Sequence, residues 1–396
     1  MKRTLLRFTL SFFPDIYTYR VNRISVSMHR KCLYAFYSRQ SMGYIPHKVK
    51  QMNSRTLLVL SILFFLCSFN SISNAGIYMK KKNLPLTSIG LPVFNGQNYI
   101  HEAIESVLNQ TYSNLELIIS DNASTDDTEK ICKYYAQKDK RIQYHRFDRN
   151  YGASRNYNRT FELSNGPYFK WLAHDDLLTS NNLEKAVAVM ENHPDVVLCG
   201  SNKKVINSKG ETIDHHNLDW LHLCKDKPEE RFRDLLRLFS RSFQHADFIF
   251  GLIRSENLKR TRLIGNYTSS DFTLLADLIL QGKFHVIGEP LFIRRFHQGI
   301  STSVYNDNPR YNTPSNTSLK IQHKTHAQIA KWYDPQGKVR YIPHFKWLNE
   351  IFGSIKKHPL NGRSKLMLYA NSYAWFFRRF STSLENHLHN LIHKKT

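Results

Sequence analysis

LELIISDNASTD, residues 115–126, joins a short apolar run directly to a polar group. The run Leu115–Ser120 predicts a buried strand. The polar residues that begin at Asp121 follow this strand and open a helix, which Ser124 can cap and which we expect to extend through Tyr135. A buried strand that turns at once into a helix is the unit from which α/β sheets are built.

The same unit recurs along the chain. Further strands are predicted at residues 88–93, 141–147, 168–173 and 196–199, and further helices near residues 100–108, 154–163 and 183–190. Strands that alternate with helices of this length predict an α/β fold with a mainly parallel sheet and helices on both faces. Ligands of such sheets bind beyond the carboxyl ends of the strands, so polar residues there are candidates for chemistry.

Composition narrows the class of protein. The chain has 396 residues, of which 41% are hydrophobic, so it can bury a sizeable core. Lys and Arg number 56 and Asp and Glu 32, and the net charge of +24 predicts attraction to anions such as nucleic acid, anionic lipid or phosphorylated substrates. The five cysteines are odd in number and form no C-x-x-C pair, which argues against a disulfide scaffold and a zinc site.

The N-terminal region, residues 1–83, shows no domain pattern. Leu57–Phe69 is apolar but shorter than the ~20 residues of a spanning helix. Residues 57–78 could be a weak membrane anchor, a signal sequence, or no part of the working protein, and we favour the third interpretation. Met79 stands directly before the first predicted strand and resembles a protein start, so residues 1–78 would then be an over-extended gene model.

The C-terminal region, residues 306–396, is rich in basic and aromatic residues, as in the run from Trp375 to Arg379. We expect helices with basic faces. Such helices suit the surface of an anionic membrane, or they form a solvated extension that packs on the core, and the sequence favours neither. N-glycosylation at the Asn122 sequon would put a glycan inside a candidate site, so we expect a cytoplasmic protein, peripheral at the inner face of the plasma membrane.

Two polar groups follow predicted strands. Carboxylate, amide and hydroxyl groups in Asp121–Asp126 can hydrogen-bond a base or a ribose, and capping by Ser124 and Asp126 would explain half of that pattern. Asp175 and Asp176 are adjacent carboxylates that repel each other unless a cation compensates. A divalent cation that bridges to diphosphate oxygens is the economical partner, although an exposed turn would also fit.

Two further groups stand near the end of the same region. Asp271 precedes an apolar helix and is either its N-cap or a general base that faces an acceptor hydroxyl. Arg294, Arg295 and His297 suit a diphosphate or a metal, and the alternative is a basic surface loop.

Together these residues resemble glycosyltransferase family 2, the nucleotide-diphospho-sugar transferases of GT-A fold, in the non-processive bacterial form. The likeness covers residues 84–305 and keeps order and spacing over several elements. Its pieces are SIGLPVFNG at 88–96, AIESVLNQTY at 103–112, ELIISDNASTD at 116–126, Asn150-Tyr151-Gly152 and Asp175-Asp176.

The resemblance implies single-sugar transfer with inversion, from a nucleotide-diphospho-sugar to a glycan or lipid-linked hydroxyl, in cell-surface polysaccharide or glycolipid synthesis. It implies Asp271 as the base, and Asp175, Asp176 and His297 as ligands of Mn²⁺ or Mg²⁺. The nucleotide would contact Pro92, Val93, Phe94, Asn95, Asp121, Asn122, Ser124, Asp126, Asn150, Gly152, Asp175 and Arg295.

Three other classes of protein remain as alternatives. Many family members carry a further Asp two residues before the pair, where this chain has Ala173, so a catalytically silent nucleotide-sugar binder stays open. A nicotinamide oxidoreductase would need a G-x-G-x-x-G turn after the first strand, and this chain has only Gly96 there. We expect no nucleic-acid partner, because the densest basic run lies in the tail and not on the core.

Overall fold

The computed structural model describes residues 84–218, 223–241, 243–297, 326–337 and 344–393. The chain divides into two compact units, 1–83 and 84–396, and all described residues belong to the second. The interpretations of residues 1–83 as signal, anchor or gene-model extension therefore fall outside the described residues.

One half of the sheet is parallel. Its strands lie in the order β3-β2-β1-β4, and they are β1 (Thr87–Val93), β2 (Leu115–Asp121), β3 (Ile142–Arg146) and β4 (Tyr168–Trp171). All residues of β1, β2 and β4 are buried, as expected for continuous apolar runs in a parallel sheet. These four strands confirm the sequence-based prediction, and their carboxyl ends meet along one edge.

The other half of the nine-stranded sheet is mixed, and most of it was not predicted. The sheet continues from β4 through β8, β6 and β9 to β5, and β7 pairs with β6. Only β6 and β9 run parallel here. The bounds are β5 (Leu177–Leu178), β6 (Val196–Ile206), β7 (Thr212–His216), β8 (Leu252–Arg254) and β9 (Lys283–Arg295).

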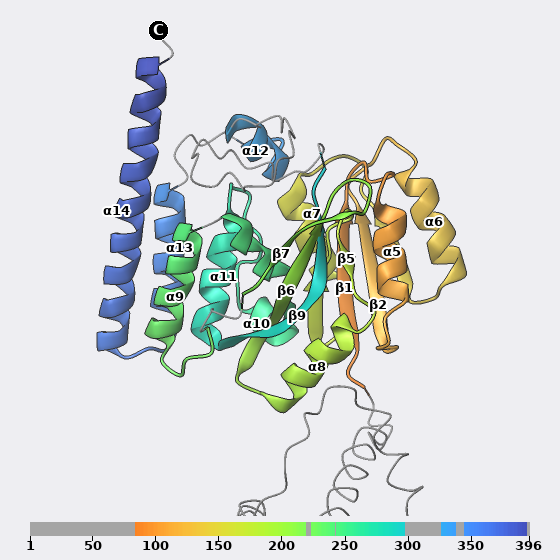
Figure 1. Ribbon diagram of the computed structural model, residues 1–396, viewed down its shortest axis with the longest axis horizontal. Coiled ribbons are helices and arrows are strands. Elements are labelled where there is room, and N and C mark those ends of the chain that lie inside the picture. Colours follow the sequence, from red (N-terminus) through yellow and green to blue (C-terminus); the bar gives the residue numbers. More distant parts are fainter. Residues whose placement is uncertain (1–83, 219–222, 242, 298–325, 338–343, 394–396) are drawn as a thin grey trace, which may run out of the picture. The chain divides into compact units, whose positions relative to one another are not determined.

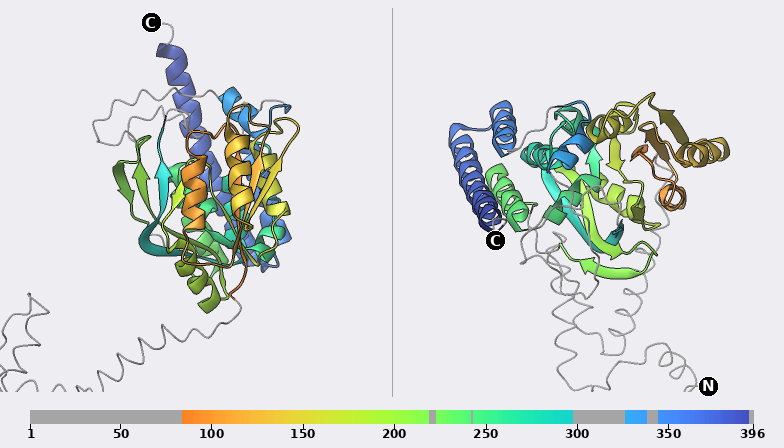
Figure 2. Two further views of the ribbon diagram at one scale, coloured as in Figure 1. Left: turned by 90° about the vertical axis from the view of Figure 1, so that its right-hand side faces the viewer. Right: turned by 90° about the horizontal axis from the view of Figure 1, so that it is seen from above.

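Helices cover both faces of this sheet, as predicted (Figures 1 and 2). One buried cluster joins the sheet to α5, α6 and α8, and another joins it to α7, α9, α11, α13 and α14. The helices of the two clusters are α5 (Ile100–Leu108), α6 (Thr128–Lys138), α8 (Asn182–Asn192), α7 (Ala153–Glu162), α9 (Pro228–Arg241) and α11 (Ser270–Gln281). Two short helices, η1 (Phe243–Phe250) and α10 (Ser255–Lys259), flank β8.

The C-terminal region is helical, as expected, and it packs on the core. Its helices are α12 (His326–Tyr333), α13 (His344–Lys357) and α14 (Gly362–His393). Trp375 is 6% exposed and stacks on Phe272 of α11 with 4.8 Å between ring centroids, and Trp347 of α13 lies beside both rings. Within the described residues, no helix is both long and apolar enough to cross a bilayer.

Candidate active site

The predicted nucleotide loop is a network of hydrogen bonds between the ends of β1 and β2. Asn95, in the left-handed region with φ 53°, donates its backbone N–H to Ser124 Oγ at 2.9 Å, and its Oδ1 accepts the Thr125 N–H at 2.9 Å. Before this turn Pro92 and Val93 are buried in β1, whereas Phe94 is 41% exposed. The turn therefore presents an aromatic side chain and polar backbone groups at the carboxyl edge of the sheet.

Ser124 does not cap the following helix, contrary to our expectation. Helix α6 begins at Thr128, and the Ser124 hydroxyl accepts the Asn95 N–H instead. Asp126 Oδ1 accepts both the N–H and the hydroxyl of Thr128, at 3.1 and 2.5 Å. Burial works to raise the pKa of Asp126, but hydrogen bonds from Thr128 and Gln97 lower it on balance, so this carboxylate orders the helix start.

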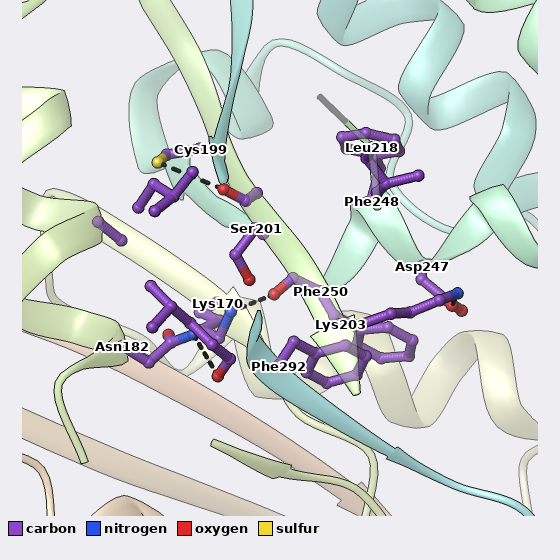
Figure 3. Close-up of a pocket in the computed structure, with 15 residues that line it drawn as sticks. Lys170, Asn182, Cys199, Ser201, Lys203, Leu218, Asp247, Phe248, Phe250 and Phe292 are labelled. Carbon is purple, nitrogen blue, oxygen red and sulfur yellow. Dashed lines mark hydrogen bonds and ion pairs between the residues drawn. The ribbon is translucent and has the colours of Figure 1, made fainter. Parts of the chain in front are cut away.

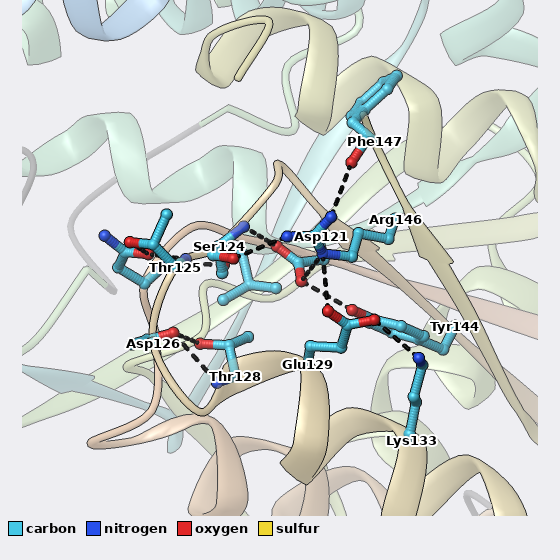
Figure 4. Close-up of polar contacts among 12 residues, drawn as sticks. Asp121, Ser124, Thr125, Asp126, Thr128, Glu129, Lys133, Tyr144, Arg146 and Phe147 are labelled. Atoms are coloured by element: carbon cyan, nitrogen blue, oxygen red, sulfur yellow. Dashed lines mark hydrogen bonds and ion pairs between the residues drawn. The ribbon is translucent and has the colours of Figure 1, made fainter. Parts of the chain in front are cut away.

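Asp121 closes β2 with a fully buried carboxylate (Figure 4). Oδ1 accepts the Ser124 N–H at 2.8 Å, and Oδ2 accepts the Tyr144 hydroxyl at 2.7 Å. Arg146 places its Nε 3.6 Å from Oδ2. These contacts fix the carboxylate at the end of β2, beneath the loop that follows it.

Asn122 continues the network toward α7. Its Nδ2 donates to Asn150 Oδ1 at 2.8 Å, and its Oδ1 accepts the Tyr151 N–H at 2.9 Å. The Gly152 N–H donates to the same Asn150 oxygen at 2.8 Å. The structure thus brings together Asn95, Asp121, Asn122, Ser124, Asn150 and Gly152, which the sequence placed in one site.

The acidic pair lies between β4 and β5, against the end of β9. Asp175 Oδ2 is 3.0 Å from His297 Nε2, and Asp176 Oδ1 accepts the Arg295 N–H at 2.9 Å. Burial works to raise the pKa of Asp175, but His174 and His297 hold it at about 2. Burial and the charge of Asp175 raise the pKa of Asp176 well above its ordinary value. The two carboxylates therefore share a site that favours one negative charge over two.

Arg295 contacts the acidic pair from inside the protein. Its side chain is 1% exposed, its Nε donates to the Asp175 carbonyl at 3.1 Å, and its Nη2 donates to Glu102 Oε2 at 2.6 Å. The guanidinium also lies over the Tyr99 ring, 4.7 Å from the centroid. These contacts join β9 to α5, and the contact expected between Arg295 and a diphosphate stays a prediction.

Arg294 points the other way, because neighbouring residues of a strand face opposite sides. It forms a buried ion pair with Asp247 of η1, which also pairs with Lys203 of β6 (Figure 3). Burial works to raise the pKa of Asp247, but Arg294 and Lys203 hold it at about 2. The charge of Arg294 also works to lower the pKa of Asp176 and of Asp271.

The sequence analysis missed Asp247 and Lys203. Lys203 is 3% exposed, and a buried lysine in a polar stretch after Cys199 gives no apolar pattern to detect. A pocket of about 30 Å³ lies beside this ion pair, lined by Lys203, Asp247, Phe248, Phe250 and Phe292 among others (Figure 3). That volume holds about one or two water molecules and no sugar ring, so the pocket is not a donor site.

Asp271 lies in the first turn of α11 and is partly buried. It is not the N-cap: the helix begins at Ser270 after Ser269, and Asp271 Oδ1 accepts only the adjacent Phe272 N–H, at 2.9 Å. Burial, with a smaller contribution from Asp247, raises the pKa of Asp271 to about 6. A carboxyl group with this pKa is poised to accept a proton near neutral pH.

The three residues expected to hold a metal come together only in part. Asp175 and His297 touch, whereas Asp176 faces Arg295. No group of three His, Cys, Asp or Glu side chains within the described ranges converges on a metal position. Mg²⁺ and Mn²⁺ are commonly held by one or two carboxylates plus substrate phosphates, so the Asp pair fits such an ion only together with a diphosphate.

Comparison with known proteins agrees with this architecture. The matched region, residues 88–260, fits the family described as Glycosyl transferase family 2. An uncharacterized glycosyltransferase of Haemophilus influenzae is 28% identical over 239 residues, covering 56% of this chain and 94% of that protein. The uncharacterized glycosyltransferase RP339 of Rickettsia prowazekii is 39% identical over 138 residues, which covers 34% of this chain. The chain spans only 42% of that rickettsial relative.

Solved structures show the same fold. Residues 1–349 of TarS from S. aureus, in complex with UDP-GlcNAc, superpose with a TM-score of 0.53 at 15% identity, covering 74% of this chain and 72% of that one. A second structure of the same fragment gives a TM-score of 0.51 at 14% identity. The fold is therefore that of the GT-A glycosyltransferases. Residues 88–260 are a glycosyltransferase family 2 domain.

Proposed function

We propose that this chain transfers a single sugar, with inversion, from a nucleotide-diphospho-sugar to a hydroxyl of a glycan or lipid-linked acceptor. The observation that carries the proposal is the Asp271 carboxyl, partly buried in the first turn of α11, where burial raises its pKa to about 6. A silent nucleotide-sugar binder would have no use for a titratable base at this position. TarS, of the same fold, binds UDP-GlcNAc, and this supports a donor of the same chemical class.

In the proposed mechanism the nucleobase and ribose of the donor lie over the loop formed by Asn95, Asp121 and Asn122. Asp271 takes the proton from the acceptor hydroxyl, whose oxygen attacks the anomeric carbon while the bond to the nucleoside diphosphate breaks. A positioned base contributes ~10²–10⁴-fold to the rate. Arg294, held by Asp247, acts electrostatically on Asp176 and would offset charge on the leaving diphosphate.

A divalent cation completes the proposal. Asp175 and Asp176, with His297 beside them, would hold Mn²⁺ or Mg²⁺ together with diphosphate oxygens. When bound, the ion neutralises charge on the leaving group. Asp176 would then ionise more readily, since its raised pKa reflects burial and the neighbouring Asp175 charge.

We place the reaction in the cytoplasm, at the inner face of the plasma membrane. Support comes from Asn122, which is 2% exposed and hydrogen-bonded through both side-chain atoms. A glycan on this sequon would break the loop, so the chain suits a compartment without N-glycosylation.

The test is a panel of nucleotide sugars, each measured with and without Mn²⁺ for the shift in melting temperature and for release of nucleoside diphosphate. Ligand at a hundredfold excess over Kd stabilises by about 2.7 kcal/mol, which is readily seen. We expect one donor class to stabilise the protein and to turn over. A donor that stabilises the protein but is never transferred or hydrolysed, with any acceptor extract, would favour the silent binder.

A further inference from the structure

The outward sides of α13 and α14 carry an unusual share of exposed apolar side chains. Of the eight large hydrophobic residues exposed in the described part of the chain, five lie on these two helices. They are Phe345 (58% exposed), Leu366 (71%), Met367 (38%), Tyr373 (46%) and Phe377 (62%). This clustering is unlike the scattered apolar side chains that any soluble surface shows.

Helical geometry gathers these side chains into one strip. Leu366, Tyr373 and Phe377 stand at positions i, i+7 and i+11 of α14, so they share a face. Trp375 and Phe376 point to the core, at 6% and 4% exposure, and fix the rotation of the helix. The aromatic run from Trp375 to Phe377 is thus divided between core and surface.

Helix α13 widens the strip. Phe345 packs on Phe376 with 5.1 Å between ring centroids, and Tyr373 lies 4.9 Å from the Phe352 ring. Phe352 and Tyr373 both belong to the line where the two helices meet, so the exposed aromatics form one continuous surface. We call the surface of Phe345, Leu366, Met367, Tyr373 and Phe377 the α13–α14 face.

The charged side chains around this face are basic. Lys356, Arg363 and Arg378 are exposed, and Arg363 stands three residues before Leu366 on the same side of α14. The one acidic residue of α13, Glu350, is 8% exposed and is neutralised by Lys346 and Arg262. The face therefore combines apolar side chains with positive charge.

We propose that the α13–α14 face lies on the surface of an anionic lipid bilayer, with its aromatic and aliphatic side chains in the headgroup region. Helices with an apolar strip and a Lys/Arg-rich border bind such interfaces, and tyrosine is favoured there. A second copy of the chain is the competing occupant. A two-fold interface would bring two positively charged surfaces together, and that repulsion disfavours it.

The inference rests on the location proposed above but not on the proposed chemistry, and its test needs no donor sugar. The full chain is sedimented with vesicles of phosphatidylcholine alone and with vesicles that also contain phosphatidylserine. We expect binding to the anionic vesicles only, and loss of binding at high salt, because the Debye length falls to about 3 Å at 1 M. Equal binding to both vesicle types would overturn the role of charge.

Two matched variants test the face itself. Leu366→Ser with Phe377→Ser should weaken vesicle binding at least tenfold, whereas Tyr134→Ser, at an aromatic residue of α6 that is 52% exposed, should leave it unchanged. Arg363→Glu should weaken binding and Lys140→Glu, an exposed change elsewhere, should weaken it less. Melting temperature and donor-induced stabilisation check that each variant is folded, and they report on the proposed function separately.

Unchanged vesicle binding by the Leu366→Ser, Phe377→Ser protein would overturn the proposal. Light scattering in solution gives the other decisive result. A dimer of the unaltered chain that the same double variant converts to a monomer would assign the α13–α14 face to a second copy and not to a membrane.

Discussion

His297 Nε2 lies 3.0 Å from Asp175 Oδ2 and thereby joins the end of β9 to the loop that follows β4. The contact helps to hold the pKa of Asp175 at about 2, against the effect of burial. A divalent cation at the acidic pair would seek the same carboxylate oxygen. Metal binding should therefore displace or share this contact, and it should depend on the diphosphate that supplies further ligands.

The first prediction concerns that cation. Nucleoside diphosphates should bind only with Mn²⁺ or Mg²⁺, because Asp175 and Asp176 otherwise repel the diphosphate. Asp176→Asn should weaken metal-dependent binding at least tenfold, a loss typical of altered metal sites. Calorimetric titration with Mn²⁺ and in EDTA measures both effects. Undiminished affinity in EDTA would remove the metal from the proposed mechanism.

The second prediction separates chemistry from binding at Asp271. Asp271→Asn cannot accept the acceptor's proton, so turnover should fall by at least ~10² while donor Kd hardly changes. Because Asp271 caps no helix, the change removes little structure. Asp226→Asn, at an exposed carboxylate, is the control and should keep normal turnover. Near-normal transfer by Asp271→Asn would show that another residue acts as the base.

The third prediction follows from the pKa of Asp271, raised to about 6. A base works in its ionised form, so kcat/KM should rise with pH through about 6 and then level off. The free energy of unfolding should change in the opposite direction, falling as pH rises. The reason is that the folded state holds the Asp271 proton more tightly than the unfolded state does. Ionisation therefore costs stability as pH rises from about 4 to 6. Melting curves should show Asp271→Asn gaining on the unaltered protein over that interval, and parallel curves would contradict the raised pKa.

Much of the fold could be predicted from sequence because β1, β2 and β4 are buried throughout, which leaves long apolar runs. Strands β5 and β8 are only two and three residues long, too short to show a pattern. The extension of β6 beyond Cys199 was missed because it includes Lys203, a polar residue in a buried position. Its partner Asp247 is 44 residues away, and only the folded chain brings the two charges together.

The candidate site divides in the same way. The loop residues Asn95, Asp121 and Asn122 follow strands directly, so their meeting at one edge could be inferred from a parallel sheet. The partners of Arg294 and Arg295 could not be inferred, because adjacent arginines differ only in the side of β9 that they face. Ser124 was misassigned as a cap because a hydroxyl near a helix start has several backbone donors within reach, here the Asn95 N–H.

The fourth prediction concerns the buried ion pair. Asp247→Leu leaves Lys203 and Arg294 buried without their shared partner, and breaking such a pair costs about 3–5 kcal/mol. The melting temperature should fall accordingly, and donor turnover should fall with it because Arg294 loses its support. Asp226→Leu, at a carboxylate whose side chain is 92% exposed, should change stability by under ~0.5 kcal/mol. Equal melting temperatures for the two variants would show that the cluster contributes nothing to folding.

The last prediction links the nucleotide loop to α12. Gly152 has φ 86°, and a Cβ there would lie 2.4 Å from the Tyr333 carbonyl oxygen and 2.6 Å from Pro335 Cδ. Ser154 Oγ donates to the same Tyr333 oxygen at 2.9 Å, so α12 rests directly on the start of α7. Gly152→Ala should therefore destabilise the fold in two ways: it forces alanine into a backbone conformation that alanine avoids, and it pushes α12 away. The backbone term alone costs of order 1–3 kcal/mol.

Gly210 provides the matched control. Its φ of 85° is nearly the same, but a Cβ there would meet nothing within 4 Å. Gly210→Ala should lower the melting temperature through the backbone term alone, since it lies in an exposed hairpin turn and has no neighbour to displace. Gly152→Ala should lower it more, and it should also weaken nucleotide binding, because the Gly152 N–H and Asn122 share the Asn150 oxygen. If both substitutions lowered the melting temperature equally and nucleotide affinity held, the contact between α12 and the nucleotide loop would have no energetic role.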